Sequence, residues 1–166
     1  MRLSVANCPV FGALGCIDLE TGKTHVIPDK PVHQLWFDDD TYMATRQYYD
    51  GSKIEMETSR IQRFTPDGEC IETLGGIGNH IDGSPDRSYF VGDRAYPGYP
   101  ADIFLYRRGE TTPIATFGGQ NFQNCTWKLQ IHPNPTFSRD GKRIYFNHTV
   151  SENRTEACFV EIDELL

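Results

Sequence analysis

The sequence predicts an all-β protein built from repeated four-stranded units of the β-propeller type. Three units begin with a histidine, at His33, His80 and His132, and the intervals of 47 and 52 residues are typical of propeller blades and other repeat units. Each histidine is followed by a polar turn and a strand rich in aromatic and β-branched residues. No helical periodicity is sustained for ten residues. We therefore expect one domain or fragment over residues 1–166, with about three and a half antiparallel blades.

The first 30 residues are expected to form only part of a blade. Residues 2–8 favour a short strand, and the segments 14–19 and 23–27 flank Glu20-Thr-Gly22, which is typical of a hairpin loop. The expected bounds of the units are 1–30 for the partial blade and about 31–76, 77–119 and 120–166 for the others.

The second and third units have the order strand, turn, strand, long loop, strand, turn, strand. In the second unit the expected long loop is the polar segment 46–58, and in the third it is 94–100. The last unit contains an Asp140-Gly141 turn, an expected loop at 151–155 and a strand at 158–162. The other expected strands lie at 33–37, 41–45, 60–64, 69–74, 89–93, 101–106, 113–117 and 144–146.

So few blades are not expected to close a ring, because propellers typically have four to eight of them. The sequence therefore leaves two alternatives, a piece of a longer propeller or a chain whose open edge associates with other copies. A small β-sandwich is the structural alternative to a propeller.

Composition excludes some classes of partner. The formal net charge of −7 argues against nucleic acid, because phosphate binding requires clustered Lys and Arg. No apolar run approaches the roughly 18 residues that span a bilayer, so no membrane partner is expected. The five cysteines include no Cys-x-x-Cys pair, and the N-terminus makes a poor signal peptide. We expect reduced cysteines and a cytoplasmic protein.

Two segments carry a resemblance to a known family. His80 is followed by Ser84-Pro-Asp86 and Gly92-Asp93, and the last unit opens with the cluster Gln130-Ile-His-Pro-Asn-Pro-Thr-Phe137. These segments resemble the C-terminal half of the oligogalacturonate lyase family, whose members are seven-bladed propellers that act on short pectin fragments. The resemblance covers about residues 30–166. The Ser-x-Asp-Gly-Lys part is shared with TolB-like propeller repeats and indicates only the architecture.

The resemblance implies a divalent metal, usually manganese, held by three histidines and a glutamine. His80 and His132 match two of the histidines. Asn134 stands in place of the third, and Gln130 is displaced by one residue from the position of the glutamine, which is Leu129 here. A one-residue shift on a strand turns a side chain to the other face unless a bulge compensates. An asparagine oxygen is also a weaker ligand for a transition metal than imidazole.

The implied reaction is β-elimination from an acidic oligosaccharide, in which a base removes the C5 proton of a uronate. We expect His33 to be this base, because it occupies the same place in its unit as His80 and histidine titrates near neutral pH. Arg46 or Arg94 is expected to bind a substrate carboxylate through a forked contact. Trp127 is a candidate stacking platform for a sugar ring.

Purely structural roles are the alternative for several of these residues. A histidine at the start of an inner strand often hydrogen-bonds within its own blade, Asp93 and Arg94 can form a hairpin ion pair, and Asp38-Asp-Asp40 is most simply a solvated turn. The alternative function is a non-catalytic propeller segment that acts as a binding or scaffold module with a degenerate metal site.

Overall fold

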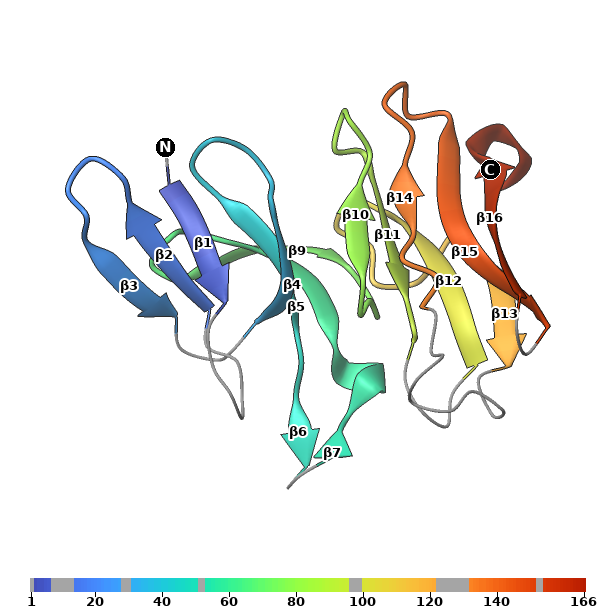
Figure 1. The fold of residues 1–166 in the computed structure, drawn as a ribbon, viewed down its shortest axis with the longest axis horizontal. Helices are drawn as coiled ribbons and strands as arrows, with labels where there is room; N and C mark the ends of the chain where they lie inside the picture. The colour runs from blue at the N-terminus through green and yellow to red at the C-terminus, as the bar shows by residue number, and fades with distance from the viewer. Residues whose placement is uncertain are drawn as a thin grey trace.

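Over the described residues the chain forms four antiparallel sheets of three or four strands, which stand side by side in chain order (Figure 1), and a separate two-stranded ribbon. The computed structural model describes residues 2–6, 14–27, 31–50, 53–95, 100–121, 132–151 and 154–166. Over these residues strands dominate, and the helical segments are single turns, η1 (Met56–Thr58) and η3 (Ile162–Glu164). The prediction of an all-β protein is therefore confirmed.

Each sheet is a meander in which every strand pairs with the next one of that sheet along the chain. The first sheet contains β1 (Arg2–Ala6), β2 (Leu14–Asp18) and β3 (Thr24–Ile27). The second contains β4 (Val32–Trp36), β5 (Tyr42–Arg46), β8 (Arg60–Phe64) and β9 (Cys70–Gly75). The third contains β10 (Ile81–Gly83), β11 (Tyr89–Asp93), β12 (Pro100–Arg107) and β13 (Ala115–Asn121). The fourth contains β14 (Thr136–Phe137), β15 (Arg143–Ser151) and β16 (Arg154–Glu161).

Two predicted loops contain more regular structure than expected. The polar segment 46–58 includes a separate two-stranded ribbon, β6 (Tyr49–Asp50) with β7 (Lys53–Ile54), which projects from the end of the second sheet (Figure 1). The prediction of a loop at 151–155 was wrong for most of that segment, because the β15–β16 ladder continues to the pair Ser151–Arg154. Cross-strand pairing stabilises polar residues there that have low strand propensity by themselves.

Among the described residues, three hydrophobic cores lie between these four sheets. Alternation along a strand sends successive side chains to opposite faces, and β11 illustrates it, because Phe90 faces the core shared with the second sheet and Val91 faces the core shared with the fourth. The second and third sheets are therefore buried on both faces. A two-sheet sandwich has a single core, so this packing excludes the sandwich alternative.

The polar turns of the third and fourth sheets have the same construction. In one, Ser84 Oγ donates to Asp86 Oδ1 (2.7 Å), and in the other Ser138 Oγ donates to Asp140 Oδ1 (2.6 Å). Each serine oxygen also accepts a backbone N–H five residues later, from Tyr89 at 3.0 Å and Arg143 at 2.9 Å. The repeat inferred from the sequence is thus a repeat of hydrogen bonds.

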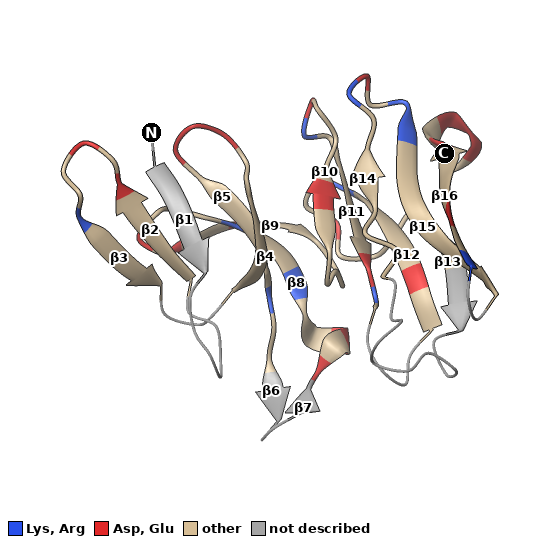
Figure 2. Cartoon of the chain, viewed as in Figure 1, with Lys and Arg blue, Asp and Glu red and all other residues tan. Residues whose placement is uncertain are grey.

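Acidic residues gather in the turns that join β2 to β3 and β4 to β5 (Figure 2). Asp38, Asp39 and Asp40 are exposed in the second of these turns, as predicted, and Asp38 is paired with Arg63 of β8. This turn follows the last residue of β4, whereas His33 lies near the first residue of that strand. The acidic run is therefore at the far end of the strand from the histidines.

The helical turns η1 and η3 are three residues long, far shorter than a bilayer span. Within the described residues, no helix is long and apolar enough to cross a membrane.

Candidate functional site

The three strand-leading histidines come together at one end of the sheets. His33 lies at the start of β4, His80 directly precedes β10, and His132 lies shortly before β14, so each lies at or before the first strand of a different sheet. The ring centroids of His33 and His80 are 4.6 Å apart, and those of His80 and His132 are 4.7 Å apart. The structure therefore joins three residues that were singled out by their spacing in the sequence.

His80 is held by a carboxylate from the next strand. The ladder pairs Ile81 with Gly92, so His80 lies opposite Asp93 at the end of β11. The Nδ1 of His80 is 3.1 Å from Asp93 Oδ1 and 3.0 Å from Oδ2, and the backbone N–H of His80 donates to Oδ1 (3.1 Å). One ring nitrogen of His80, Nδ1, thus has the structural role within its own sheet that was the alternative to metal binding.

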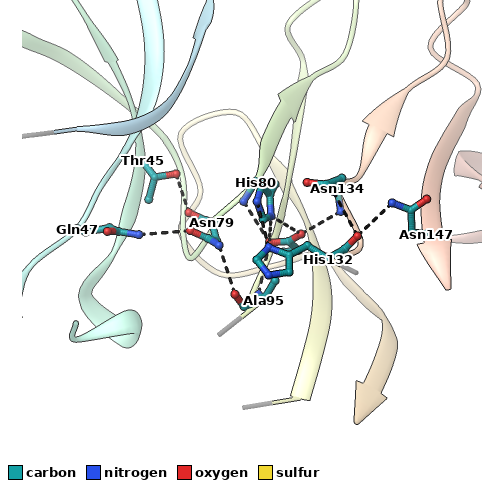
Figure 3. A network of polar contacts seen from close by, with 10 residues as sticks. Thr45, Gln47, Asn79, His80, Ala95, His132, Asn134 and Asn147 are labelled. Carbon is teal, nitrogen blue, oxygen red and sulfur yellow. Dashed lines mark hydrogen bonds and ion pairs between the residues drawn. The ribbon is translucent and has the colours of Figure 1, made fainter. Parts of the chain in front are cut away.

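The other ring nitrogen of His80 faces His132. The distance from His80 Nε2 to His132 Nδ1 is 3.2 Å, and Figure 3 shows both rings beside Asn134. His132 is held in turn through its carbonyl oxygen, which accepts from Asn147 Nδ2 of β15 (3.1 Å) and from Asn134 Nδ2 (3.3 Å).

Two residues of the site have an unusual backbone. His33 has a φ of 55° and Asn134 a φ of 45°, in the left-handed region that non-glycine residues rarely adopt. Asparagine and histidine are both enriched there among non-glycine residues, and a backbone hydrogen bond also supports Asn134. Its backbone N–H donates to Asp93 Oδ2 (3.1 Å), which compensates part of the cost.

A buried polar network supports the cluster from the second sheet. Thr45 Oγ1 donates to the carbonyl of Gly78 (2.6 Å), and Gln47 Nε2 approaches Asn79 Oδ1 (3.4 Å) (Figure 3). Asn79 is almost fully buried, donates to the carbonyl of Ala95 (3.3 Å) and raises the pKa of the nearby His33. Sequence reasoning missed Asn79, although its place directly before His80 was a usable signal.

A close approach between backbones explains Gly92. A Cβ added at Gly92 would lie 2.6 Å from the Cα of Gly78, closer than side-chain atoms can be. The absence of a side chain at both positions lets β11 contact the segment that leads to His80. The Gly-Asp dipeptide therefore has two uses, close packing at Gly92 and a carboxylate at Asp93.

The surroundings keep two of the imidazoles neutral. Burial, followed by the charges of His80 and His132, lowers the pKa of His33 from 6.5 to about 4, against opposing contributions from Asp93 and Asn79. The pKa of His132 is lowered too, by burial and then by His80. His33 is exposed, so solvent screening reduces the contribution of this pKa shift to stability.

These lowered pKa values predict a loss of stability in acid. The unfolded chain takes up protons near pH 6.5 and folded His33 only near pH 4, so the His33 contribution falls as the pH drops from about 6.5 to about 4. The full difference would be worth about 3 kcal/mol, and solvent access reduces it to about 1 kcal/mol. Urea unfolding of chelator-treated protein at pH 7 and pH 4.5 measures it. A His33→Gln variant should lose about 1 kcal/mol less over this interval; an equal loss would contradict the prediction.

The predicted arginines have other partners. Arg94 pairs with Asp102 (2.5 Å) and with Glu57 (3.3 Å), and the predicted Asp93–Arg94 hairpin pair is wrong, since Asp93 bonds His80 instead. Arg46 has its guanidinium 5.9 Å from the centre of the Tyr48 ring. The substrate roles of both arginines stay predictions.

Two predicted site residues, Gln130 and Trp127, lie outside the described residues. Within the described ranges, no three His, Cys, Asp or Glu side chains are arranged as a group that could hold a metal ion. His80 and His132 are the predicted ligands that the structure brings together, with Asn134 next to them.

The architecture is matched by a known structure. The crystal structure of TolB from Acinetobacter baumannii, a β-propeller protein, superposes with a TM-score of 0.57 over 98% of this chain, at 17% sequence identity. The fold is of the β-propeller type. At this identity the likeness concerns the fold alone, and the matched region is 38% of the TolB chain.

The sequence comparisons give no further assignment, since no protein-family profile and no curated protein match the chain. The propeller architecture is thus supported, while the resemblance to the oligogalacturonate lyase family stays a prediction. The number of blades and the closure of a ring stay predictions as well.

Proposed function

We propose that the cluster of His33, His80 and His132 is the centre of a lyase site that binds a divalent cation and an acidic oligosaccharide containing uronate. The observation that carries this proposal is the 3.2 Å between His80 Nε2 and His132 Nδ1, with His80 fixed by buried Asp93. Manganese is the cation that the family resemblance implies.

The spacing of the two nitrogens fits two ligands of one ion. Nitrogen ligands lie about 2.1 Å from such an ion, so two of them at an angle of about 90–110° are roughly 3.0–3.4 Å apart. The ligand atom of His132 is then Nδ1, because this atom faces His80. A histidine ligand whose other nitrogen is bonded to a carboxylate is a common arrangement in metal sites, and His80 with Asp93 has it. Asn134 and Gln130 are proposed to complete the set.

The base of the proposed reaction is His33. It removes the proton from C5 of the uronate, the electron pair of this bond forms the C4–C5 double bond, and the C4–O bond breaks as the leaving oxygen takes up a proton. A cation bound at this site would neutralise the uronate carboxylate and stabilise the negative charge that develops in this step. The lowered pKa of His33 keeps its imidazole unprotonated at neutral pH, as a base requires.

Elemental analysis of protein purified without chelator tests the proposal. We expect about one divalent ion per chain, lost in the His80→Ala/His132→Ala double variant, because a ligand set reduced by two imidazoles binds weakly. The control is His25→Ala, which changes an exposed histidine on β3 of the first sheet that pairs with Asp67. The metal-loaded protein should release unsaturated products from oligogalacturonides. Absence of metal from the unaltered protein would contradict the proposal.

The alternative is a propeller module that binds such a ligand without reaction. It is favoured by the finding that the described residues contain no complete metal-holding group and that the charge of Arg94 is compensated by two carboxylates. Calorimetric binding of oligogalacturonides that is unaffected by chelator, without unsaturated product, would support this alternative against the lyase.

A further inference from the structure

We infer that Asp93 is a positioning residue that fixes which ring nitrogen carries the proton on His80 and, through His80, on His132. The inference concerns the chain Asp93–His80–His132, in which three side chains are joined by two contacts of 3.0 and 3.2 Å. Its significance for catalysis rests on the proposed function, whereas the proton positions do not.

The environment of Asp93 makes it an acceptor. It is completely buried, at 0% exposure, and the described groups around its oxygens are N–H donors. Oδ1 accepts from the backbone of His80 (3.1 Å) and lies 3.4 Å from the backbone nitrogen of Ala95, and Oδ2 accepts from the backbone of Asn134 (3.1 Å). A carboxylate in this position requires a hydrogen on any further nitrogen at contact distance, because a buried polar pair with two facing lone pairs is unfavourable.

This requirement determines the tautomer of His80 first. Its Nδ1 is 3.0 Å from Asp93 Oδ2 and must therefore carry the hydrogen, which leaves a lone pair on Nε2 of the neutral ring. The Nδ1 of His132, 3.2 Å from that lone pair, must then carry a hydrogen as well. In their neutral forms both rings are thus Nδ1–H tautomers.

A cation affects the two histidines differently. His80 already presents an unprotonated Nε2 and needs no change. His132 has to move its hydrogen from Nδ1 to Nε2 before Nδ1 can act as a ligand, so its hydrogen bond to His80 is exchanged for a metal bond. Binding is therefore expected to change the tautomer of His132 and to leave that of His80 unaltered.

Asp93 also connects the third sheet to the segment before β14. By accepting the N–H of Asn134, whose φ is 45°, it holds the turn that follows His132. Asp82 connects the same two sheets in a comparable way, since its Oδ2 accepts from Thr136 Oγ1 (2.7 Å) and from the N–H of Phe137 (2.9 Å). Within the described residues Asp82 makes no hydrogen bond to the histidine rings, which makes Asp82→Asn a matched control for a purely structural role.

The test is long-range ¹H–¹⁵N NMR of the histidine rings in chelator-treated protein at neutral pH, assigned with His80→Gln and His132→Gln. We expect Nδ1–H on both rings, and addition of Zn²⁺, a diamagnetic probe, should move only the His132 hydrogen to Nε2. In Asp93→Asn an amide NH₂ replaces one acceptor, so His80 should lose its single tautomer and the Zn²⁺ affinity should fall about 10–100-fold. Asp82→Asn should keep both tautomers and an affinity within about threefold of the unaltered protein.

An Nε2–H tautomer on His80 in the unaltered protein would overturn the inference, as would equal effects of Asp82→Asn and Asp93→Asn on the tautomers. The expected tautomers in a protein that binds no Zn²⁺ would support the role of Asp93 and contradict the proposed function. If Asp93→Asn does not fold, the tautomers of the unaltered protein decide the question alone.

Discussion

Replacement of Phe90 by alanine is expected to lower the free energy of unfolding by about 3–5 kcal/mol. Phe90 is completely buried in the core between the second and third sheets, where its ring is stacked 6.2 Å from that of Phe37. Deletion of the ring removes apolar contacts and leaves a cavity that rigid strands on both sides do not fill. Such a loss is a large fraction of the 5–15 kcal/mol typical of a folded domain. Equilibrium urea unfolding measures it.

The matched control is Phe159→Ala on β16. Phe159 is 53% exposed, so its truncation should change the free energy of unfolding by less than about 1 kcal/mol. Similar losses in both variants would contradict the assignment of Phe90 to a core between two sheets.

Replacement of His33 by glutamine is expected to lower kcat on oligogalacturonides by about 10²–10⁴-fold, the contribution typical of a general base. Glutamine keeps a polar side chain at this position but has no basic nitrogen. The cation affinity should stay within about threefold, because His80 and His132 are the proposed ligands. Steady-state kinetics together with a calorimetric Mn²⁺ titration separate the two effects.

His25→Gln provides the control, since His25 lies on β3 and pairs with Asp67 at the surface. An unchanged kcat in His33→Gln would remove His33 from the reaction. A large loss of cation affinity in the same variant would make His33 a ligand and leave the base unassigned.

The fold was predictable because its signals are local. Ser84 and Ser138 each precede a short turn and an aromatic strand, and the hydrogen bonds of both turns involve only neighbouring residues. The loop predicted at 151–155 failed for the opposite reason, since Ser151 and Arg154 are in a strand only through pairing across the hairpin.

The sequence allowed the three histidines of the site to be predicted, but not the contacts that hold them. The repeat spacing indicated that His33, His80 and His132 begin equivalent strands, and equivalent strand starts meet when sheets stack in chain order. The positive φ of His33 depends on tertiary packing that no local pattern encodes. The role of Asp93 needed the register that sets it opposite His80, so the sequence suggested Arg94 as its partner instead.

The division of the three histidines among three sheets has a consequence for the cooperativity of unfolding. In a row of sheets that contact only their neighbours, an end sheet can separate while the others stay folded, as in other repeat arrays. A ligand that contacts all three rings binds only while the second, third and fourth sheets are docked, and at a free concentration 100 times its Kd it adds about 2.7 kcal/mol to that docked state. Ligand binding would thus couple two separate interfaces and make these sheets unfold as one unit.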